Sequence, residues 1–167
     1  MRVYLPATST LLGELHERGL IGPAPLTGFA VTPGIREWYV DEDVDELEYA
    51  ASGQAARASV RLIDADPSAL RRRVVLSVDV PDEQITVADG LERGAVRIST
   101  AVPASSVAAV HVDDADAEEV VGAAAVAVIE ADLGSEAAQQ RVDDAEGYEL
   151  SWYAPQELAD VVAHLQQ

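Results

Sequence analysis

Residues 73–80 read Arg-Val-Val-Leu-Ser-Val-Asp-Val, and this stretch does most to decide the fold. It is rich in β-branched residues and alternates little between polar and apolar positions, which is typical of a central strand covered on both faces. Pro81 ends it, because proline cannot donate to a sheet ladder. The run Arg71-Arg72-Arg73 at its start is interpreted as a solvated strand end rather than an anion site.

Further strands are expected before and after this stretch. Each candidate is a short run with β-branched or aromatic residues, and Gly and Pro turns such as Gly22-Pro23-Ala24-Pro25 lie between the runs. The expected strands are Arg2–Leu5, Leu26–Thr32, Ile85–Val87, Gly94–Val102, Val107–Val112 and Tyr148–Tyr153.

The clearest helix is predicted over Val44–Ile63, where the apolar residues fall within one narrow arc at the α-helical period. That arc is mostly alanine and can pack closely, and Asp66-Pro67 stops the helix. A later helix through Val120 and Leu133 is apolar nearly all round, so we expect it to be buried on most sides. Other helices are expected over 8–19, 35–39, 136–142 and 155–165.

This order of elements alternates strands and helices without a strict βαβ period. It predicts an α/β or α+β class, with a mixed sheet of about five to six strands packed by helices. The length of 167 residues suits a single domain over residues 1–167. A boundary between two halves, if one exists, would lie at 81–94.

The charge is strongly one-sided. There is no lysine, and 11 arginines stand against 30 Asp and Glu, for a formal net charge of -19. Such a surface repels phosphate backbones and anionic lipids, so we expect neither nucleic acid nor a membrane as partner. A GC-rich genome is the favoured cause of this composition, and a salt-adapted cytoplasm is the alternative.

Cysteine is absent, which excludes disulfides and thiolate chemistry. Polar residues follow Met1–Pro6 at once, which is unlike a signal peptide, and Val120–Ile129 is too short to cross a bilayer. A cytoplasmic location is therefore expected, and no cofactor is predicted.

Three groups of acids could hold a divalent cation, because Mg²⁺ and Ca²⁺ take oxygen ligands. They are Asp41-Glu42-Asp43 with Asp45, Glu46 and Glu48; Asp113-Asp114 with Asp116, Glu118 and Glu119; and Asp143-Asp144 with Glu146. The first two precede helices, where acids cap free backbone N–H groups and oppose the helix dipole. Capping is the favoured explanation for both.

His111 and Asp113 lie two residues apart at the expected end of a strand, so both side chains should point to one face. They could share a proton or a metal ion, with Arg36 and Glu48 as further catalytic candidates. The metal version of this hypothesis uses His111, Asp113, Asp114 and Asp116. The plainer interpretation is that His111 is a surface or capping residue.

Two Trp-Tyr pairs occur in a chain with 5% aromatic residues. If Trp38, Tyr39, Trp152 and Tyr153 lined one cleft, they would offer flat apolar walls with polar tips to a planar ligand or a partner's side chains. The alternative is that they anchor the core.

Several segments resemble a family of uncharacterised actinobacterial proteins. These segments are the opening Met1-Arg2-Val3-Tyr4-Leu5-Pro6, Phe29–Pro33 with Arg36–Tyr39, and Ala109–Asp116, and the likeness extends to Glu48–Ala51 and Trp152–Ala154. It is a family of unknown function. The resemblance implies a GC-rich bacterial source and a cytoplasmic setting, and it assigns no catalytic residue.

We therefore expect a soluble, acidic binding module that takes a protein partner or a ligand and could form a homodimer. No Gly-x-Ser-x-Gly elbow or phosphate loop favours an enzyme. The first alternative is a small metal-dependent or acid/base enzyme that uses His111 and the nearby carboxylates. The second is a DNA mimic that presents its acids to a basic partner.

Overall fold

A computed structural model describes residues 1–39 and 43–167 of the chain, and its centre is a seven-stranded sheet. The strands are β1 (Arg2–Ala7), β2 (Leu20–Ile21), β3 (Leu26–Phe29), β4 (Val74–Asp79), β5 (Ile85–Val87), β6 (Ala95–Ile98), β7 (Val102–Pro103), β8 (Val107–Asp113) and β9 (Leu150–Tyr153). The main sheet has the order β5-β6-β3-β1-β4-β8-β9, and β2 pairs with β7 in a separate ribbon.

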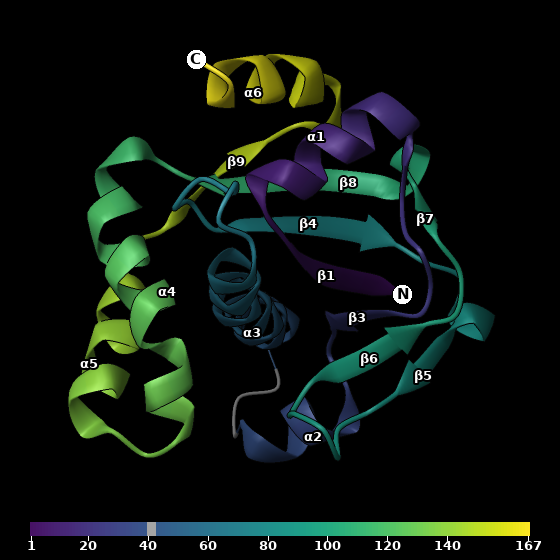
Figure 1. The fold of residues 1–167 in the computed structure, drawn as a ribbon. Coiled ribbons are helices and arrows are strands. Elements are labelled where there is room, and N and C mark those ends of the chain that lie inside the picture. The colour runs from purple at the N-terminus through teal and green to yellow at the C-terminus, as the bar shows by residue number, and fades with distance from the viewer. Residues whose placement is uncertain (40–42) are drawn as a thin grey trace.

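Six α-helices among the described residues accompany the sheet. They are α1 (Ser9–Arg18), α2 (Pro33–Trp38), α3 (Val44–Ala65), α4 (Glu118–Asp132), α5 (Glu136–Ala145) and α6 (Leu158–Leu165). Figure 1 shows α1 and α6 together on one side of the sheet and α3 on the other, with α4 and α5 as a pair beside α3. None of the helices in the described part of the chain is long and apolar enough to cross a membrane.

β4 is an interior strand covered on both faces, as residues 73–80 predicted. Val74, Leu76 and Val78 point into the apolar core beneath α1 and α6. Val75 points the other way, into a smaller core with Ala51 and Ala55 of α3. β4 pairs with β1 on one side and with β8 on the other, so its backbone groups are satisfied along both edges.

α3 packs closely on the sheet because its buried face is made of small residues. Ala51, Ala55 and Ser59 are fully buried there. The Ser59 hydroxyl donates to the Ala7 carbonyl at 2.7 Å and accepts from the Val74 amide at 3.1 Å. This one side chain therefore ties α3 to β1 and β4, which is possible only where no large side chain holds the helix away.

The helix α4 differs from the expectation. One side packs on α5 and on Val60 and Ile63 of α3. On the opposite side Val126 and Ile129 are 76% and 61% exposed, and Leu133, which caps the C-terminal end of the helix, is 83% exposed. The expectation that α4 is buried on most sides is therefore wrong, because α3 and α5 cover only one side of it.

The fold class is confirmed, and three details of the sheet differ. It has seven strands where about five to six were expected, and every pairing among the described strands is antiparallel where a mixed sheet was expected. The expected strand over 94–102 is divided into β6 and β7, which belong to different sheets. Asp41 and Glu42 of the first acid group lie outside the described residues.

Candidate functional site

A groove of about 790 Å³ runs along α3 on the face of the sheet opposite α1 and α6. Its walls come from the end of α2, the outer positions of α3, the turn before β6, strand β8 and the segment that leads into β9. Its lining residues are Trp38, Tyr39, Glu46, Tyr49, Ala50, Ser52, Gly53, Gln54, Ala56, Arg57, Arg73, Arg93, His111, Glu146, Tyr148, Glu149 and Leu150.

The helix α2 places Trp38 at one end of this groove. Its start is encoded locally, because the Thr32 side chain accepts a hydrogen bond from the Ile35 amide and Pro33 occupies the first turn. Ile35 is fully buried and anchors the helix. The helix ends at Trp38, and the Tyr39 amide closes its last turn on the Ile35 carbonyl.

The Asp89 carboxylate fastens α2 to the hairpin of β5 and β6. It accepts hydrogen bonds from the Thr32 hydroxyl at 2.5 Å, the Gly34 amide at 3.0 Å and the Gly94 amide at 2.8 Å. Gly34 must lack a side chain, since a Cβ there would lie 2.5 Å from Asp89 Oδ1. Burial raises the pKa of Asp89, but these hydrogen bonds outweigh that effect and leave the pKa below its usual value.

Three exposed aromatic residues are among the lining residues of the groove. Trp38 is 61% exposed, and the Arg93 guanidinium lies 3.7 Å from the centre of its ring. Tyr39 and Tyr49 are exposed as well. The Tyr49 hydroxyl donates to Glu149 at 2.9 Å, and this hydrogen bond raises the pKa of Tyr49. The lining therefore offers exposed aromatic faces, and Glu149 already holds the polar tip of one of them, Tyr49.

His111 lies at the sheet side of the groove. Its Nε2 atom is 2.9 Å from the Ser77 hydroxyl oxygen on the neighbouring strand β4. Burial lowers the pKa of His111, and the positive charge of Arg2 lowers it further. The imidazole is therefore neutral at pH 7. Ser77 is only 2% exposed, so a bound molecule would reach the His111 ring and not the serine.

Asp113 is on the same face as His111, as the spacing predicted, but it is fully engaged by Arg73. The Arg73 Nε and Nη2 atoms donate to its two oxygens at 2.8 Å each, and the Arg73 amide donates at 2.8 Å as well. Arg73 Nη2 also donates to the Tyr148 carbonyl. Both side chains are at most 3% exposed. The interpretation of Arg73 as a solvated strand end is therefore wrong.

A side-chain cap is present for the first acid group and absent from the second, although Glu118 and Glu119 of the second group lie in the first turn of α4, where they oppose the helix dipole. Asp43 caps α3 by accepting from the Asp45 amide. In the second group the residue before α4 is Ala117, which makes no side-chain cap. There Asp113 holds Arg73, and Asp114 accepts from the Ser151 hydroxyl at 2.8 Å. Asp113 and Asp114 thus make tertiary contacts, which the spacing of acids in the sequence does not reveal.

The third acid group lies along the end of α5. Asp143 and Asp144 accept hydrogen bonds from Gln139 and Gln140, one helical turn earlier. Glu146 pairs with Arg57 of α3 at the groove.

Residues 1–39 and 43–167 contain no group of three or more His, Asp or Glu side chains placed to hold a metal ion, and Asp116 stands exposed.

The four aromatic residues singled out in the sequence do not meet in one cleft. Trp38 and Tyr39 line the groove. Trp152 is opposite His111 on the edge strand β9 but is not part of the groove lining. Tyr153 points to the other face of the sheet and packs against the core beneath α6. Adjacent strand residues alternate in direction, which separates Trp152 from Tyr153.

Arg36 and Glu48 are not part of the groove lining either. Arg36 is exposed on α2. Glu48 accepts a hydrogen bond from the Tyr4 hydroxyl at 3.4 Å. Burial, together with the charge of Glu48, raises the pKa of Tyr4 to about 12. Glu48 therefore holds a core tyrosine.

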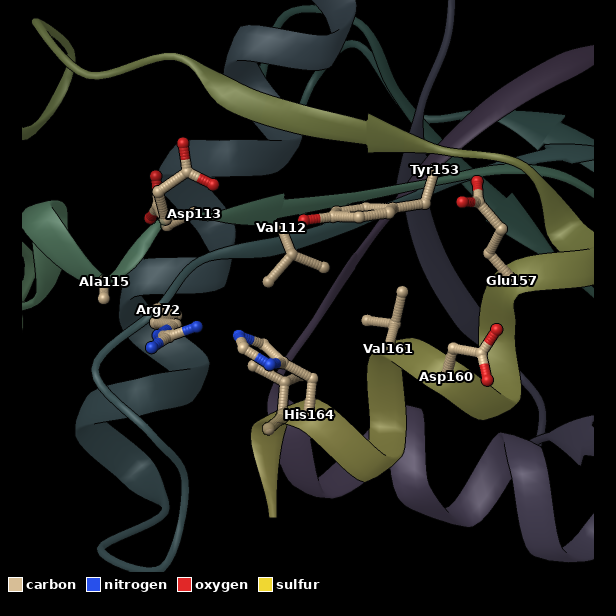
Figure 2. Close-up of a pocket in the computed structure, with 11 residues that line it drawn as sticks. Arg72, Val112, Asp113, Ala115, Tyr153, Glu157, Asp160, Val161 and His164 are labelled. Atoms are coloured by element: carbon tan, nitrogen blue, oxygen red, sulfur yellow. The ribbon is translucent and has the colours of Figure 1, made fainter. Parts of the chain in front are cut away.

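A smaller cavity of about 320 Å³ lies on the opposite face, between α6 and the end of β8. Figure 2 shows the Tyr153 ring across it, the His164 imidazole turned toward Arg72, and the carboxylates of Asp160 and Glu157 at the other end. Arg72 donates to Glu118, and Glu157 accepts from the Ala154 amide. Much of its polar lining is therefore already paired.

Reasoning from the sequence missed Tyr49, Arg57, Arg73 and Arg93 of the groove. Tyr49, at least, could have been found, because it lies on the polar side of the predicted helix over 44–63 and follows Trp38 and Tyr39 closely in the chain. The position of Arg93 over Trp38 depends on the Asp89 contacts and has no local signal.

Comparisons with known proteins give a family and nothing finer. Searches of curated proteins and of solved structures found no significant match. A family model described as a family of unknown function (DUF6912) matches residues 1–162, which is nearly the whole chain. The segments that carry the expected resemblance all lie within this range, and the chain belongs to this family, DUF6912.

Proposed function

We propose that this protein is a binding module whose groove along α3 takes a flat ring system on a neutral or cationic ligand. The observation that carries the proposal is that three exposed aromatic side chains, Trp38, Tyr39 and Tyr49, are among the residues that line a groove of about 790 Å³. Clefts of roughly 300–1,000 Å³ with aromatic walls and a few fixed polar groups are typical of sites for small ligands.

The polar groups of the groove are better suited to orienting a bound ligand than to catalysing a reaction. Arg57 is paired with Glu146, Arg73 with Asp113, and Tyr49 with Glu149. These contacts hold the walls in place before a ligand arrives, which lowers the entropy lost on binding. His111 is neutral and can exchange a hydrogen bond with a ring nitrogen or hydroxyl.

The charge of the molecule selects against anions. A net charge of -19 lowers the local concentration of anionic ligands and raises that of cationic ones. Glu46 adds a carboxylate to the groove lining. Aromatic faces also attract cations directly, as the position of Arg93 over Trp38 illustrates.

The acid/base alternative has less support from this geometry. His111 is the one histidine among the lining residues of the groove, and its hydrogen-bond partner is the hydroxyl of the buried Ser77. Asp113 cannot orient His111 while it holds Arg73 by three hydrogen bonds. A base without an accessible nucleophile or an orienting acid favours binding over catalysis.

The two tryptophans provide a direct test. The chain has only Trp38 and Trp152, so a ¹H–¹⁵N spectrum contains two indole signals, one in the groove and one outside it. Titration with indole, quinoline, benzamidine and benzoate should shift the Trp38 signal and leave the Trp152 signal in place. Benzamidine should bind more tightly than the anionic benzoate.

Matched variants identify the signals and the site. Trp38→Ala and Tyr49→Ala should each weaken binding of benzamidine, whereas Trp152→Ala should not, although Trp152 is as exposed as Trp38. No shift of the Trp38 signal at millimolar fragment, or equal shifts of both indole signals, would contradict the proposal.

A further inference from the structure

The cavity between α6 and the end of β8 is separate from the groove and lies on the other face of the sheet. Its volume is about 320 Å³. Val112, Val161 and Leu165 are buried and give it apolar surface, and the Tyr153 ring crosses it (Figure 2). Sites for small ligands have volumes of roughly 300–1,000 Å³, so this cavity suits a ligand at the small end of that range.

Hydrogen-bond donors meet at one end of this cavity. Figure 2 shows the His164 imidazole turned toward Arg72, and the Tyr153 hydroxyl points to the same end. The Arg72 Nε atom donates to Glu118 at 2.7 Å, which holds the guanidinium in place and leaves its two Nη atoms unpaired within residues 1–39 and 43–167. The Tyr153 hydroxyl is likewise without a partner among these residues. Donors that converge in this way suit a carboxylate.

The direction of the His164 side chain supports a donor role. It lies one helical turn after Asp160 on α6, and side chains at this spacing are neighbours. No ion pair joins the two residues in the described part of the chain, and the imidazole faces Arg72 instead. An imidazole has an N–H group in either protonation state. His164 therefore adds a donor beside Arg72 rather than neutralising the nearby acid.

Carboxylates occupy the opposite end of the cavity. Figure 2 shows Asp160 and Glu157 there. One Glu157 oxygen accepts from the Ala154 amide at 2.7 Å, whereas the Asp160 side chain has no partner in the described residues. Acids near the start of a helix are common. The distinctive feature here is that they share one small cavity with unpaired donors at its other end.

We infer that this cavity binds a short zwitterion, a molecule whose carboxylate and ammonium groups are separated by a few methylenes. The carboxylate accepts hydrogen bonds from Arg72, His164 and Tyr153. The ammonium donates to Asp160, and the methylenes lie along the apolar surface between the two ends. Charge-assisted hydrogen bonds at both ends fix the orientation of such a ligand.

The charges around the cavity favour a zwitterion over simpler ions. An anion is repelled by the net charge of -19, and a cation alone leaves the donors unmatched. A zwitterion has no net charge and matches both ends. Two further acids line the donor end, but Arg73 neutralises Asp113, and Asp114 accepts from the Ser151 hydroxyl.

Calorimetric titration with 4-aminobutyrate, butyrate and butylamine tests this inference. The last two ligands each keep one charged end of the first. We expect 4-aminobutyrate to bind about tenfold or more tightly than either, because each lacks one set of charge-assisted hydrogen bonds. Binding of butylamine as tight as that of 4-aminobutyrate would indicate a plain cation site and overturn the proposal. No heat from millimolar 4-aminobutyrate would overturn it as well.

Two conservative variants place the site in the cavity. Tyr153→Phe keeps the ring and removes the hydroxyl, and it should weaken binding of 4-aminobutyrate by about threefold to tenfold. Asp160→Asn should weaken it by about tenfold. The matched control is Asp64→Asn, which makes the same change of charge at an exposed position of α3 outside the cavity lining and should leave binding unchanged.

Circular dichroism should show all three variants folded. Equal effects of Asp160→Asn and Asp64→Asn would mean that only the overall charge matters, and would overturn the proposal. Unchanged binding in Tyr153→Phe together with Asp160→Asn would place 4-aminobutyrate elsewhere on the molecule, with the same consequence. None of these results depends on the groove along α3.

Discussion

At the scale of single residues, the contact between Arg73 and Asp113 is the most constrained polar interaction described for this fold. Two charges are removed from water, which is costly, and the cost is offset by the ion pair and by hydrogen bonds from the Arg73 amide and to the Tyr148 carbonyl. Neither partner can be lost alone without leaving an uncompensated charge in the interior.

We expect Asp113→Asn to lower the free energy of unfolding by about 3–5 kcal/mol, because it leaves the Arg73 guanidinium buried without its counterion. Urea denaturation followed by circular dichroism measures this loss. The control is Asp132→Asn, which breaks the exposed pair with Arg61 and should cost less than about 1 kcal/mol. Equal losses in the two variants would show that burial of the pair has no special energetic weight.

His111 makes stability depend on pH. Its pKa is lower in the folded state than its usual value near 6.5, so between these two values the unfolded chain binds a proton that the folded chain does not. Its contribution is therefore present above about pH 6.5 and is lost as the pH falls through the lowered pKa.

We expect the free energy of unfolding to decrease between pH 7 and pH 5, and His111→Gln to flatten this dependence. Urea denaturation at several pH values provides the measurement. His16→Gln removes an exposed imidazole and serves as the control. If the pH dependence of the free energy of unfolding persisted in His111→Gln and disappeared in His16→Gln, His111 would not be its source.

At the scale of elements, the short helix α2 illustrates how one tertiary contact completes a local signal. Thr32 and Pro33 begin the helix, but six residues are too few for a helix to be stable by itself. Asp89 supplies the missing stability by binding the Thr32 hydroxyl and the Gly34 amide from the β5–β6 hairpin.

Asp89→Asn should therefore lower the free energy of unfolding by about 1–3 kcal/mol, because the amide cannot accept from the Thr32 hydroxyl and the Gly34 and Gly94 amides at once. It should also shift the Trp38 indole signal, since Trp38 ends the helix that Asp89 holds. Thermal unfolding and the ¹H–¹⁵N spectrum measure the two effects. Glu83→Gln, in the exposed turn before β5, should change neither.

Elements with strong local signals could be predicted from the sequence, and those that depend on contacts could not. The helix over 44–63 and the strand over 73–80 have clear periodicity and clear ends, and both are present as α3 and β4. The ribbon of β2 and β7 has two residues in each strand, too few for a pattern. The exposed side of α4 was expected to be covered because composition does not say which neighbours a helix has.

At the scale of the whole molecule, the excess of carboxylates sets the electrostatic balance. Six ion pairs occur within the described residues, and Arg73–Asp113 is the one that is buried on both sides. Exposed pairs contribute little. The chain has 30 acidic residues and only 11 arginines. Repulsion among the carboxylates therefore outweighs the attraction within the exposed ion pairs.

We expect the thermal unfolding midpoint to rise by a few degrees between about 0.02 and 0.5 M NaCl, because salt screens the net repulsion more than it weakens the exposed pairs. Differential scanning calorimetry measures the midpoint. A midpoint that falls with salt would mean that attractive pairs dominate.

The arrangement of the site was largely beyond reach of the sequence. The spacing of His111 and Asp113 correctly predicted that both side chains share a face of the sheet. It could not indicate that Arg73, forty residues earlier, lies across from Asp113 on the neighbouring strand. The placement of Trp38 and Trp152 in different environments likewise follows from strand order, which local patterns do not encode.

The Arg73 side chain has one more consequence for the architecture. Its guanidinium grips Asp113, where the chain leaves the sheet, and Tyr148, just before the chain re-enters it as β9. The segment between Asp113 and Tyr148, which contains α4 and α5, therefore has both of its ends held by one side chain. A change in the length of α4 or α5 should therefore leave the pairing of β8 with β9 in place, because Arg73 fixes both ends of the intervening segment.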